Sequence, residues 1–359
     1  MRLPHLAAFI LTAVLAFADP VAIVPADFGN ALQPQVAIAA DGTVHVALGR
    51  GTEIFVATSR NGGRSFEAPV KVGELPKLAL GMRRGPRIAV AGREVTITAI
   101  SHDTGDLFGF HSSNGGQAWS APTRINDVAR AAGEGLDGLA QGPQGRLFVT
   151  WLDHRTGKME IYGAESLDAG RTWGPNLLVY HSPEDKVCEC CHPSAAYNSA
   201  GDLVVMFRNW LQGNRDLWIT TRRAGQKAFA AASRQGEASW KLPGCPMDGG
   251  AIFSLADDSF ASVWRRDKEV FLSTKAKPES RLGEGTQPIA FSGRDGVQVW
   301  WQQGVNLMRT STAPGATATL FATNAKFAAA AVSPRDGSVV VAFEGTAEPR
   351  KGLFAEIFR

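Results

Sequence analysis

Long hydrophobic runs are nearly absent from this chain of 359 residues. After the first 18 residues, no stretch of about 18 apolar residues follows, which excludes a protein anchored by membrane-spanning helices. An excess of one charge is also lacking, because 37 Lys and Arg stand against 34 Asp and Glu. That balance gives no reason to expect nucleic acid or a membrane surface as a partner. Low-complexity segments, linkers and long amphipathic helices are missing as well.

The single apolar run occupies residues 1–18 and reads MRLPHLAAFILTAVLAFA. It places Arg2 before the apolar residues and ends in Ala16-Phe17-Ala18, a pattern typical of a secretory signal peptide cut after Ala18. The run is too short to span a bilayer. We therefore expect residues 19–359 to form one soluble domain that is secreted or periplasmic.

One short turn occurs three times in the first half of the chain. The copies read SRNGGRSF from Ser59, SSNGGQAW from Ser112 and SLDAGRTW from Ser166, so they begin 53 and 54 residues apart. Their Asn or Asp side chains can hydrogen-bond the local backbone, and their glycines can adopt positive φ. A repeat of about 50 residues with turn residues at fixed offsets predicts a β-propeller of four-stranded blades.

Seven repeating units can be recognised by their strand pairs. The pairs fall at residues 35–47, 86–100, 139–151, 195–207, 251–264, 288–301 and 328–343. The last unit has no obvious fourth strand, and residues 21–24 are predicted to supply it and close the ring. The sequence thus predicts an all-β propeller with seven blades, with six blades as the alternative.

Strand order sorts the loops between the two ends of such a ring. Loops between second and third strands share one end with the crossovers between blades, and the repeated turns lie at the other end. The first end collects most of the residues that carry chemistry: Arg83, Arg84, Arg87, Asp103, Asp106, Asp153, His154, Arg155, Arg208, Asn209, Arg215, Asp216, Arg265, Arg266 and Asp267. All four cysteines fall at the same end. We therefore place the functional site there.

The repeated turn, Ser-x-Asp/Asn-x-Gly-x-x-Trp/Phe, resembles the Asp-box of the sialidase (neuraminidase) superfamily. This resemblance implies a propeller, normally of six blades, that hydrolyses an acidic glycan. In that family, three arginines hold the substrate carboxylate. The segment from Arg84 to Ile88 is similar to the family's Arg-Ile-Pro element, with the order changed. Asp103 resembles the family's general acid.

Arginines that converge on one mouth can form bidentate contacts with a carboxylate, phosphate or sulfate. The candidate substrate-binding residues at this end are Arg84, Arg87, Arg208, Arg215 and Arg265. The alternative is that these arginines pair with neighbouring Asp residues in a solvated rim. The family's nucleophile is a tyrosine near the end of the chain, whereas the three tyrosines here are Tyr162, Tyr180 and Tyr197. The nucleophile is therefore missing, and Tyr180 or Tyr197 would have to replace it.

The run Cys188-Glu189-Cys190-Cys191-His192 is the least generic feature of the sequence. Four cysteines in an exported protein predict two disulfides, for which three connectivities exist. The alternative is a metal site made by Cys188, Cys190, Cys191, His192 and Cys245, which would favour Cu(I) or Zn(II). Free or redox-active thiols are a third interpretation. In the first two interpretations, Cys245 must lie beside at least one of the other three cysteines.

Two functions follow from these features. The first is a secreted propeller that recognises, and as an enzyme hydrolyses, an acidic glycan or another anionic small molecule at an arginine-lined mouth. The second is a non-catalytic periplasmic propeller whose cysteine cluster binds copper or zinc, or fixes a loop that binds a protein partner. The missing late tyrosine favours the second function, and the acidic loop and the arginines favour the first.

Overall fold

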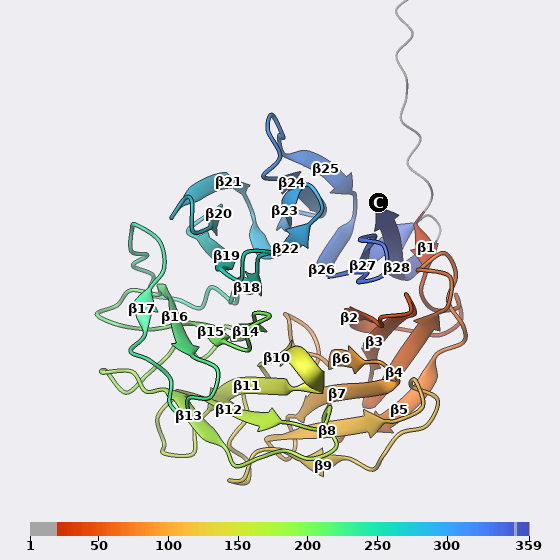
Figure 1. The fold of residues 1–359 in the computed structure, drawn as a ribbon, viewed down its shortest axis with the longest axis horizontal. Coiled ribbons are helices and arrows are strands. Elements are labelled where there is room, and N and C mark those ends of the chain that lie inside the picture. The colour runs from red at the N-terminus through yellow and green to blue at the C-terminus, as the bar shows by residue number, and fades with distance from the viewer. Residues whose placement is uncertain (1–19, 348–349, 359) are drawn as a thin grey trace, which may run out of the picture.

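The computed structural model describes residues 20–347 and 350–358. The predicted signal peptide, residues 1–18, lies outside them. The described residues form seven four-stranded antiparallel sheets arranged as blades around a ring (Figure 1). The all-β propeller with seven blades is therefore confirmed, and the alternative of six is wrong. No helix in the described part of the chain is long and apolar enough to cross a membrane.

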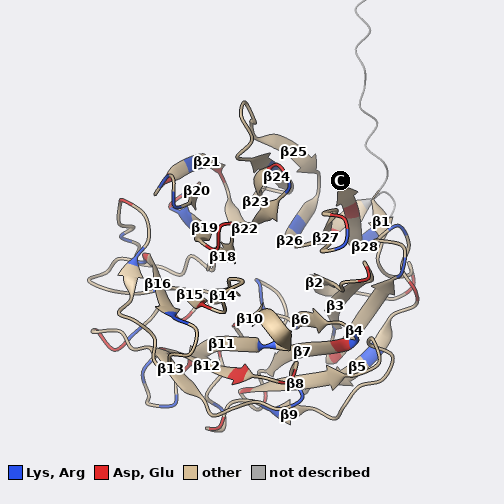
Figure 2. Cartoon of the chain, in the orientation of Figure 1, with Lys and Arg blue, Asp and Glu red and all other residues tan. Residues whose placement is uncertain are grey.

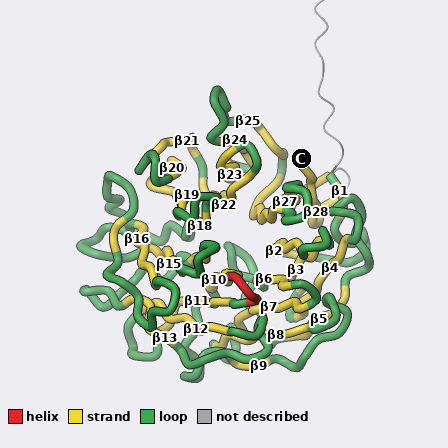
Figure 3. Tube along the Cα trace, viewed as in Figure 1, coloured by secondary structure: helices red, strands yellow, loops and turns green. Residues whose placement is uncertain are grey.

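Each blade takes its strands in chain order from the centre of the ring outwards. Blade one contains β2 (Leu32–Ile38), β3 (Val44–Arg50), β4 (Glu53–Ser59) and β5 (Val70–Glu74). Blade two contains β6 (Arg87–Ala91), β7 (Glu94–Ser101), β8 (Asp106–Ser112) and β9 (Thr123–Arg124). Blade three contains β10 (Asp137–Gln141), β11 (Leu147–Asp153), β12 (Glu160–Ser166) and β13 (Leu177–Tyr180), with the short 3-10 helix η1 (Pro143–Gly145) after β10 (Figure 3).

The remaining blades follow the same order. Blade four contains β14 (Ser194–Tyr197), β15 (Leu203–Arg208), β16 (Leu217–Arg222) and β17 (Ser233–Arg234). Blade five contains β18 (Ala251–Ser254), β19 (Phe260–Arg266), β20 (Glu269–Ser273) and β21 (Ser280–Glu284). Blade six contains β22 (Thr286–Gly293), β23 (Gly296–Gln303), β24 (Asn306–Ser311) and β25 (Thr319–Ala322).

Blade seven closes the ring. It contains β26 (Ala325–Val332), β27 (Val339–Ala347) and β28 (Arg350–Phe358), and its outermost strand is β1 (Val21–Ala22) from the other end of the chain. Val21 pairs with Ala355, and Ala22 pairs with Phe354. The predicted fourth strand is thus confirmed. Because β1 comes from the opposite end of the sequence, its pairing with β28 connects the two ends of the described chain and covers the edge that β28 would otherwise expose.

Apolar residues fill the space between each pair of neighbouring blades. Successive side chains of a strand point to opposite faces, so a central strand of a propeller needs apolar residues on both. Trp300 packs towards blade seven, and the next residue, Trp301, packs towards blade five. Val204 and Val205 divide in the same way between blades five and three. This two-sided burial explains why the second strands read as continuous apolar runs.

The three repeated turns adopt one hydrogen-bonding pattern. In the third copy, the Ser166 hydroxyl donates to Asp168 Oδ1, and the Gly170 and Thr172 amides donate to Ser166 Oγ and Asp168 Oδ1 at 2.8 and 2.9 Å. Gly170 has a φ of +83°, and a Cβ there would lie within 3 Å of Thr96 in blade two. The turn therefore packs each repeat onto the blade before it, which is a structural role.

The two ends of the ring differ in what they carry. Ser166, at the start of the third turn, pairs with Leu147, where β11 begins. β11 ends at Asp153, and Met159 beside it meets the crossover that carries the cysteines, since Val187 N donates to Met159 O at 3.0 Å. We call this second end, with the crossovers and the loops between second and third strands, the crossover face. Acidic and basic residues are interspersed around the ring (Figure 2).

His45 makes folding dependent on pH. It is 2% exposed in β3, with its Nδ1 3.3 Å from the Thr58 hydroxyl. Burial lowers the pKa of His45 from its usual 6.5 to about 4. Between these two values the unfolded chain binds a proton that the folded chain does not. This contribution to stability is therefore present above pH 6.5 and is lost as the pH falls towards 4.

We expect His45 alone to lower the free energy of unfolding by about 3 kcal/mol between pH 7 and pH 4. Urea denaturation of the wild type and of His45→Gln at several pH values measures this slope. His154→Gln is the matched control, because His154 is exposed. Equal pH slopes in His45→Gln and the wild type would contradict the assignment.

Candidate metal centre

The crossover between β13 and β14 brings three cysteines to the crossover face. Its backbone is tied to two neighbouring blades: Val187 N donates to Met159 O, and Cys188 N donates to Arg208 O at 2.9 Å. Val187 and Cys188 are both fully buried. These two bonds hold the segment at the ends of β12 and β15. The following residues, from Glu189 to Cys191, turn back over the centre of blade four.

The sulfur atoms of Cys188, Cys190 and Cys191 form a compact triangle. The Cys188–Cys190, Cys188–Cys191 and Cys190–Cys191 distances are 3.6, 3.5 and 4.0 Å. All three side chains are buried, with exposures of 0, 7 and 1%. A disulfide would need a separation of about 2.05 Å, so none of these pairs is bonded. We call these three residues the sulfur triangle.

An arginine and a backbone amide donate hydrogen bonds to the sulfur triangle. Arg215 Nη1 donates to Cys188 Sγ at 3.0 Å, and the amide of Asp248 donates to Cys191 Sγ at 3.4 Å. Hydrogen bonds with Cys190 and Cys191 lower the pKa of Cys188, and the positive charges of Arg208 and Arg215 lower it further. Its contact with Cys188 raises the pKa of Cys190, and burial raises that of Cys191. The arrangement therefore stabilises one thiolate, at Cys188.

The fourth cysteine comes from the next crossover, between β17 and β18. Cys245 is exposed, unlike the other three. After Cys188, the Cys245 thiol adds to the raised pKa of Cys190. Two crossovers separated by about 55 residues in sequence thus meet over the sulfur triangle, because consecutive blades are neighbours in a propeller.

His192 does not join the sulfur triangle. Its Nε2 lies 3.1 Å from the carbonyl oxygen of Gly250. Burial lowers the pKa of His192 to about 3, and the positive charges of Arg83 and Arg87 add to this effect. In the described part of the chain, the group of potential metal ligands at this place contains only Cys188, Cys190 and Cys191. Including His192 in the ligand set was therefore wrong.

Arg208 is a structural residue and not a free ligand for an anion. It is 1% exposed, and its guanidinium donates to the carbonyls of Asp248, Arg215 and Arg265. These three carbonyls belong to separate segments. Arginine suits this position because its planar group carries five N–H donors with fixed directions. The prediction that Arg208 would face an open mouth is corrected by this burial.

Arg84 and Arg87 are also held by backbone carbonyls. Arg87 is 8% exposed and donates to the carbonyl oxygens of Asp137 and Arg83, and its Nε lies 3.8 Å from the buried Asp137 carboxylate. Arg84 donates to the Glu134 carbonyl at 2.8 Å. These bonds fix the crossover into blade two and use two of the three nitrogens of Arg87, whose Nη1 is buried without a partner.

Arg215 and Arg265 lie beside the cysteine-bearing crossovers and do not line an open mouth. Arg215 is 5% exposed and stacks on Trp210, with its Cζ 4.4 Å from the ring centre, while it contacts Cys188. Arg265 donates to the carbonyls of Asp267 and Pro246 and lies 5.3 Å from the Trp240 ring. The five arginines predicted to bind substrate thus each donate to backbone carbonyls.

Arg83 connects opposite sides of the ring, a role that the sequence did not indicate. Its guanidinium donates to the side chain and carbonyl of Gln287 and to the carbonyl of Ala328, at 2.9, 2.7 and 2.8 Å. The Gln287 amide in turn donates to the buried Asp248 carboxylate at 2.7 Å. Gln287 has no sequence feature that marks it, because its partners lie 39 and 204 residues away.

Asp103 does not occupy a site suited to a general acid. Its side chain is 47% exposed and lies 3.0 Å from the ammonium group of Lys77, which is 75% exposed. A general acid needs a buried or like-charged environment that retains its proton near neutral pH. Asp103 is exposed and pairs with a lysine, so it has neither kind of environment. Its surroundings therefore do not support the predicted catalytic role.

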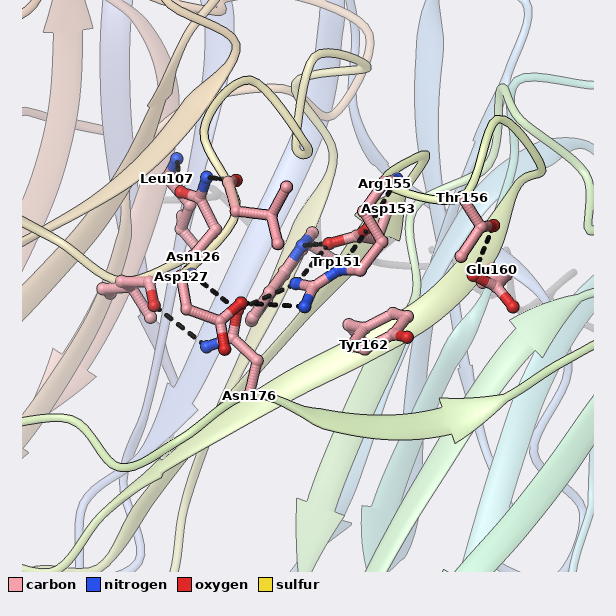
Figure 4. A network of polar contacts seen from close by, with 12 residues as sticks. Leu107, Asn126, Asp127, Trp151, Asp153, Arg155, Thr156, Glu160, Tyr162 and Asn176 are labelled. Atoms are coloured by element: carbon pink, nitrogen blue, oxygen red, sulfur yellow. Dashed lines mark hydrogen bonds and ion pairs between the residues drawn. The ribbon is translucent and has the colours of Figure 1, made fainter.

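In blade three, the loop that carries Asp153 and Arg155 is held by a network of polar contacts (Figure 4). Asp153 is fully buried and accepts bonds from Trp151 Nε1 and from the Arg155 guanidinium at 2.7–2.9 Å. Arg155 continues to Asp127 at 2.8 Å and lies 3.9 Å above the ring of Tyr162. Both carboxylate oxygens of Asp153 are used in this way, so its bonds hold the loop after β11 in place.

The tyrosines do not replace the missing nucleophile. Tyr197 ends β14 at the opposite end of the ring, where its hydroxyl donates to Glu165 at 3.0 Å. Tyr180 accepts a hydrogen bond from Asn209 at 2.9 Å, and burial raises its pKa. A nucleophilic phenolate requires a lowered pKa, so neither environment favours one.

The structural role of Arg208 can be tested by substitution. We expect Arg208→Lys to lower the free energy of unfolding by about 2–4 kcal/mol, because a lysine satisfies fewer of the three buried carbonyls. Asp103→Asn should change it by less than about 1 kcal/mol, since that pair is exposed. Urea denaturation measures both. Unchanged stability in Arg208→Lys would return Arg208 to the set of free binding residues.

The chain matches no protein-family model and no curated protein sequence. Solved structures share its fold. An α-L-arabinofuranosidase from Fusarium graminearum superposes with a TM-score of 0.56 at 12% identity, over 95% of this chain and 98% of that one. A virginiamycin B lyase from Staphylococcus aureus gives 0.54 at 12% identity, over 91% and 95%. A Hadza microbial sialidase gives 0.52 at 12% identity, over 92% and 65%. These likenesses show a propeller fold shared with sialidases and other propeller enzymes.

Proposed function

We propose that this protein binds a soft transition metal ion, copper or zinc, through Cys188, Cys190 and Cys191 on the crossover face. The observation that carries the proposal is the sulfur triangle, with edges of 3.5–4.0 Å. Thiolates placed about 2.3 Å from one tetrahedral ion are about 3.8 Å from one another. The three sulfurs therefore have the spacing of ligands around a shared ion.

The surroundings supply what such a centre needs. Binding a metal requires thiolates, and Arg215 next to Cys188 offsets part of their negative charge. The Asp248 amide bonded to Cys191 Sγ orients a second ligand from outside the triangle. Burial of all three side chains excludes water and protects the thiolates from oxidants. The interpretation with two disulfides would need the sulfurs to approach by more than 1 Å.

Elemental analysis of protein purified under reducing conditions tests this function. We expect about one copper or zinc ion per chain in the wild type and a loss of at least about tenfold in metal affinity in Cys191→Ser. Glu189→Gln is the matched control, because Glu189 lies in the same loop with a side chain that is 41% exposed. Wild-type protein with no bound metal and a cross-linked pair of cysteine peptides would contradict the proposal.

A second candidate function is recognition of an acidic glycan. The observation that favours it is a cavity of about 630 Å³ on the crossover face, between blades one, six and seven. Its lining includes Lys326 and Lys351, the carboxylate of Glu344, which lies 3.5 Å from the Lys326 ammonium group, and the polar residues Asn30, Gln302 and Asn324. The Gln302 side-chain oxygen is buried without a hydrogen-bond partner, so it is free to accept a bond from a ligand hydroxyl. Proteins of similar structure that act on glycans support this second function.

Isothermal titration with sialyllactose and with neutral arabinobiose tests the second candidate. We expect the acidic sugar to bind more tightly, and Lys326→Ala combined with Lys351→Ala to weaken its binding by at least about tenfold, since each charge-assisted contact contributes about 1.5–3 kcal/mol. Lys277→Ala, an exposed lysine outside the cavity, serves as the control. Equal affinity of the variants and the wild type would exclude this cavity as the glycan site.

A further inference from the structure

Cys245 lies on a short surface arch above the sulfur triangle. On one side, the arch is anchored at Trp240, whose carbonyl accepts a bond from Arg215 N at 2.8 Å. On the other side, it is anchored at Asp248, which is fully buried and bonded through its side chain to Gln287 N. Pro243 and Cys245 between these anchors are exposed. The fourth thiol is therefore accessible to solvent and lies two residues before Met247, whose side chain packs against the triangle.

Met247 covers the same sulfurs with a thioether. Its side chain packs against the cluster made by Cys188, Cys190 and Cys191. Its backbone has a φ of +55°, a left-handed conformation that is unfavourable for a non-glycine residue. A bond from Gln287 Nε2 to the Met247 carbonyl holds this conformation. The surrounding structure thus keeps a strained methionine directed at the sulfur triangle.

We propose that the centre is an exchange site for cuprous copper, in which Cys245 passes Cu(I) between the surface and the buried triangle. This inference rests on the proposed metal centre and specifies its ion and its route of exchange. Thiolates suit both zinc and Cu(I), and the adjacent thioether, which is not among the usual zinc ligands, favours Cu(I). No histidine or carboxylate of the described residues belongs to the ligand group.

The transfer proceeds by ligand exchange without a change of oxidation state. A sulfur-ligated Cu(I) carrier, either a small thiol complex or a thiol-bearing protein, first shares its ion with Cys245. The Cys245 thiol releases one proton to solvent as its sulfur binds, and one donor sulfur leaves. Cys190 then takes the ion as the remaining donor sulfur leaves, followed by Cys188 and Cys191. Cys190 and Cys191 each release a proton as they bind, Cys188 binds as the thiolate, and Cys245 and the departing donor sulfurs each regain a proton from solvent.

Anaerobic exchange with a cuprous chelator tests the route. Full-length protein receives Cu(I) from its glutathione complex, and excess bathocuproine disulfonate then removes it while absorbance records both rates. We expect Cys245→Ser to keep one Cu(I) per chain with nearly unchanged affinity, and to slow loading and removal by at least about tenfold. Gly244→Ser is the matched control, because a side chain there meets only Leu242, at 3.9 Å.

The identity of the ion is tested by competition between Cu(I) and Zn(II). Met247→Leu should weaken Cu(I) binding by about tenfold and leave zinc affinity unchanged, since it removes the thioether and retains the apolar volume. Equal rates for Cys245→Ser and the wild type would overturn the exchange role, as would loss of Cu(I) from Cys245→Ser. Wild-type protein that binds zinc but not Cu(I) would overturn this inference and leave the metal centre standing. Binding of neither ion would overturn both.

Discussion

The guanidinium of Arg208 connects most of the parts that form the crossover face. Its three donors bind carbonyls in blade four, in the crossover that carries Cys245 and in blade five. Its own carbonyl accepts the amide of Cys188. Both cysteine-bearing crossovers are therefore positioned by one residue at the end of β15. Because the group is buried, each of these bonds replaces a contact with water that folding removes, and losing one would leave a costly unsatisfied carbonyl.

These contacts give the arginines of the crossover face a structural role. Irregular crossovers near the centre of a propeller expose carbonyls that no strand can satisfy, and water has little access to them. An arginine provides five donors from a single side chain, so a few arginines can satisfy several such segments. Arg83, Arg87 and Arg208 all act in this way. Their convergence near the centre is a solution to backbone burial and not a preformed anion site.

The sulfur triangle benefits from the same rigidity. Three thiols held at 3.5–4.0 Å by anchored crossovers require little rearrangement to accept an ion, so less binding free energy is spent on ordering the loop. The cavity beside Lys326 lies on the same face but between other blades. Two chemically different regions, one of sulfur and one of polar groups, therefore share the crossover face. Such separation is natural in a propeller, where each blade contributes its own loops to a common face.

The sequence by itself determined the fold, the blade count, the strand that closes the ring and the face on which the cysteines lie. These features depend on local patterns: short apolar runs, turn residues at a regular spacing and the order of strands, which assigns each loop to one end. The role of the repeated turns also follows, because their hydrogen bonds join residues at most four positions apart.

Tertiary structure alone decided which polar residues are free to act. Asp103 and Asp153 look alike in sequence, yet one is exposed beside a lysine and the other is buried with every oxygen used. His192 follows Cys191 directly in the sequence, but its Nε2 hydrogen-bonds with the carbonyl oxygen of Gly250, 58 residues away. Arg208 and Arg215 are seven residues apart, and only Arg215 contacts a cysteine sulfur. For Asp103, His192 and Arg215 the deciding partner lies on another segment, and tertiary packing determines which groups meet.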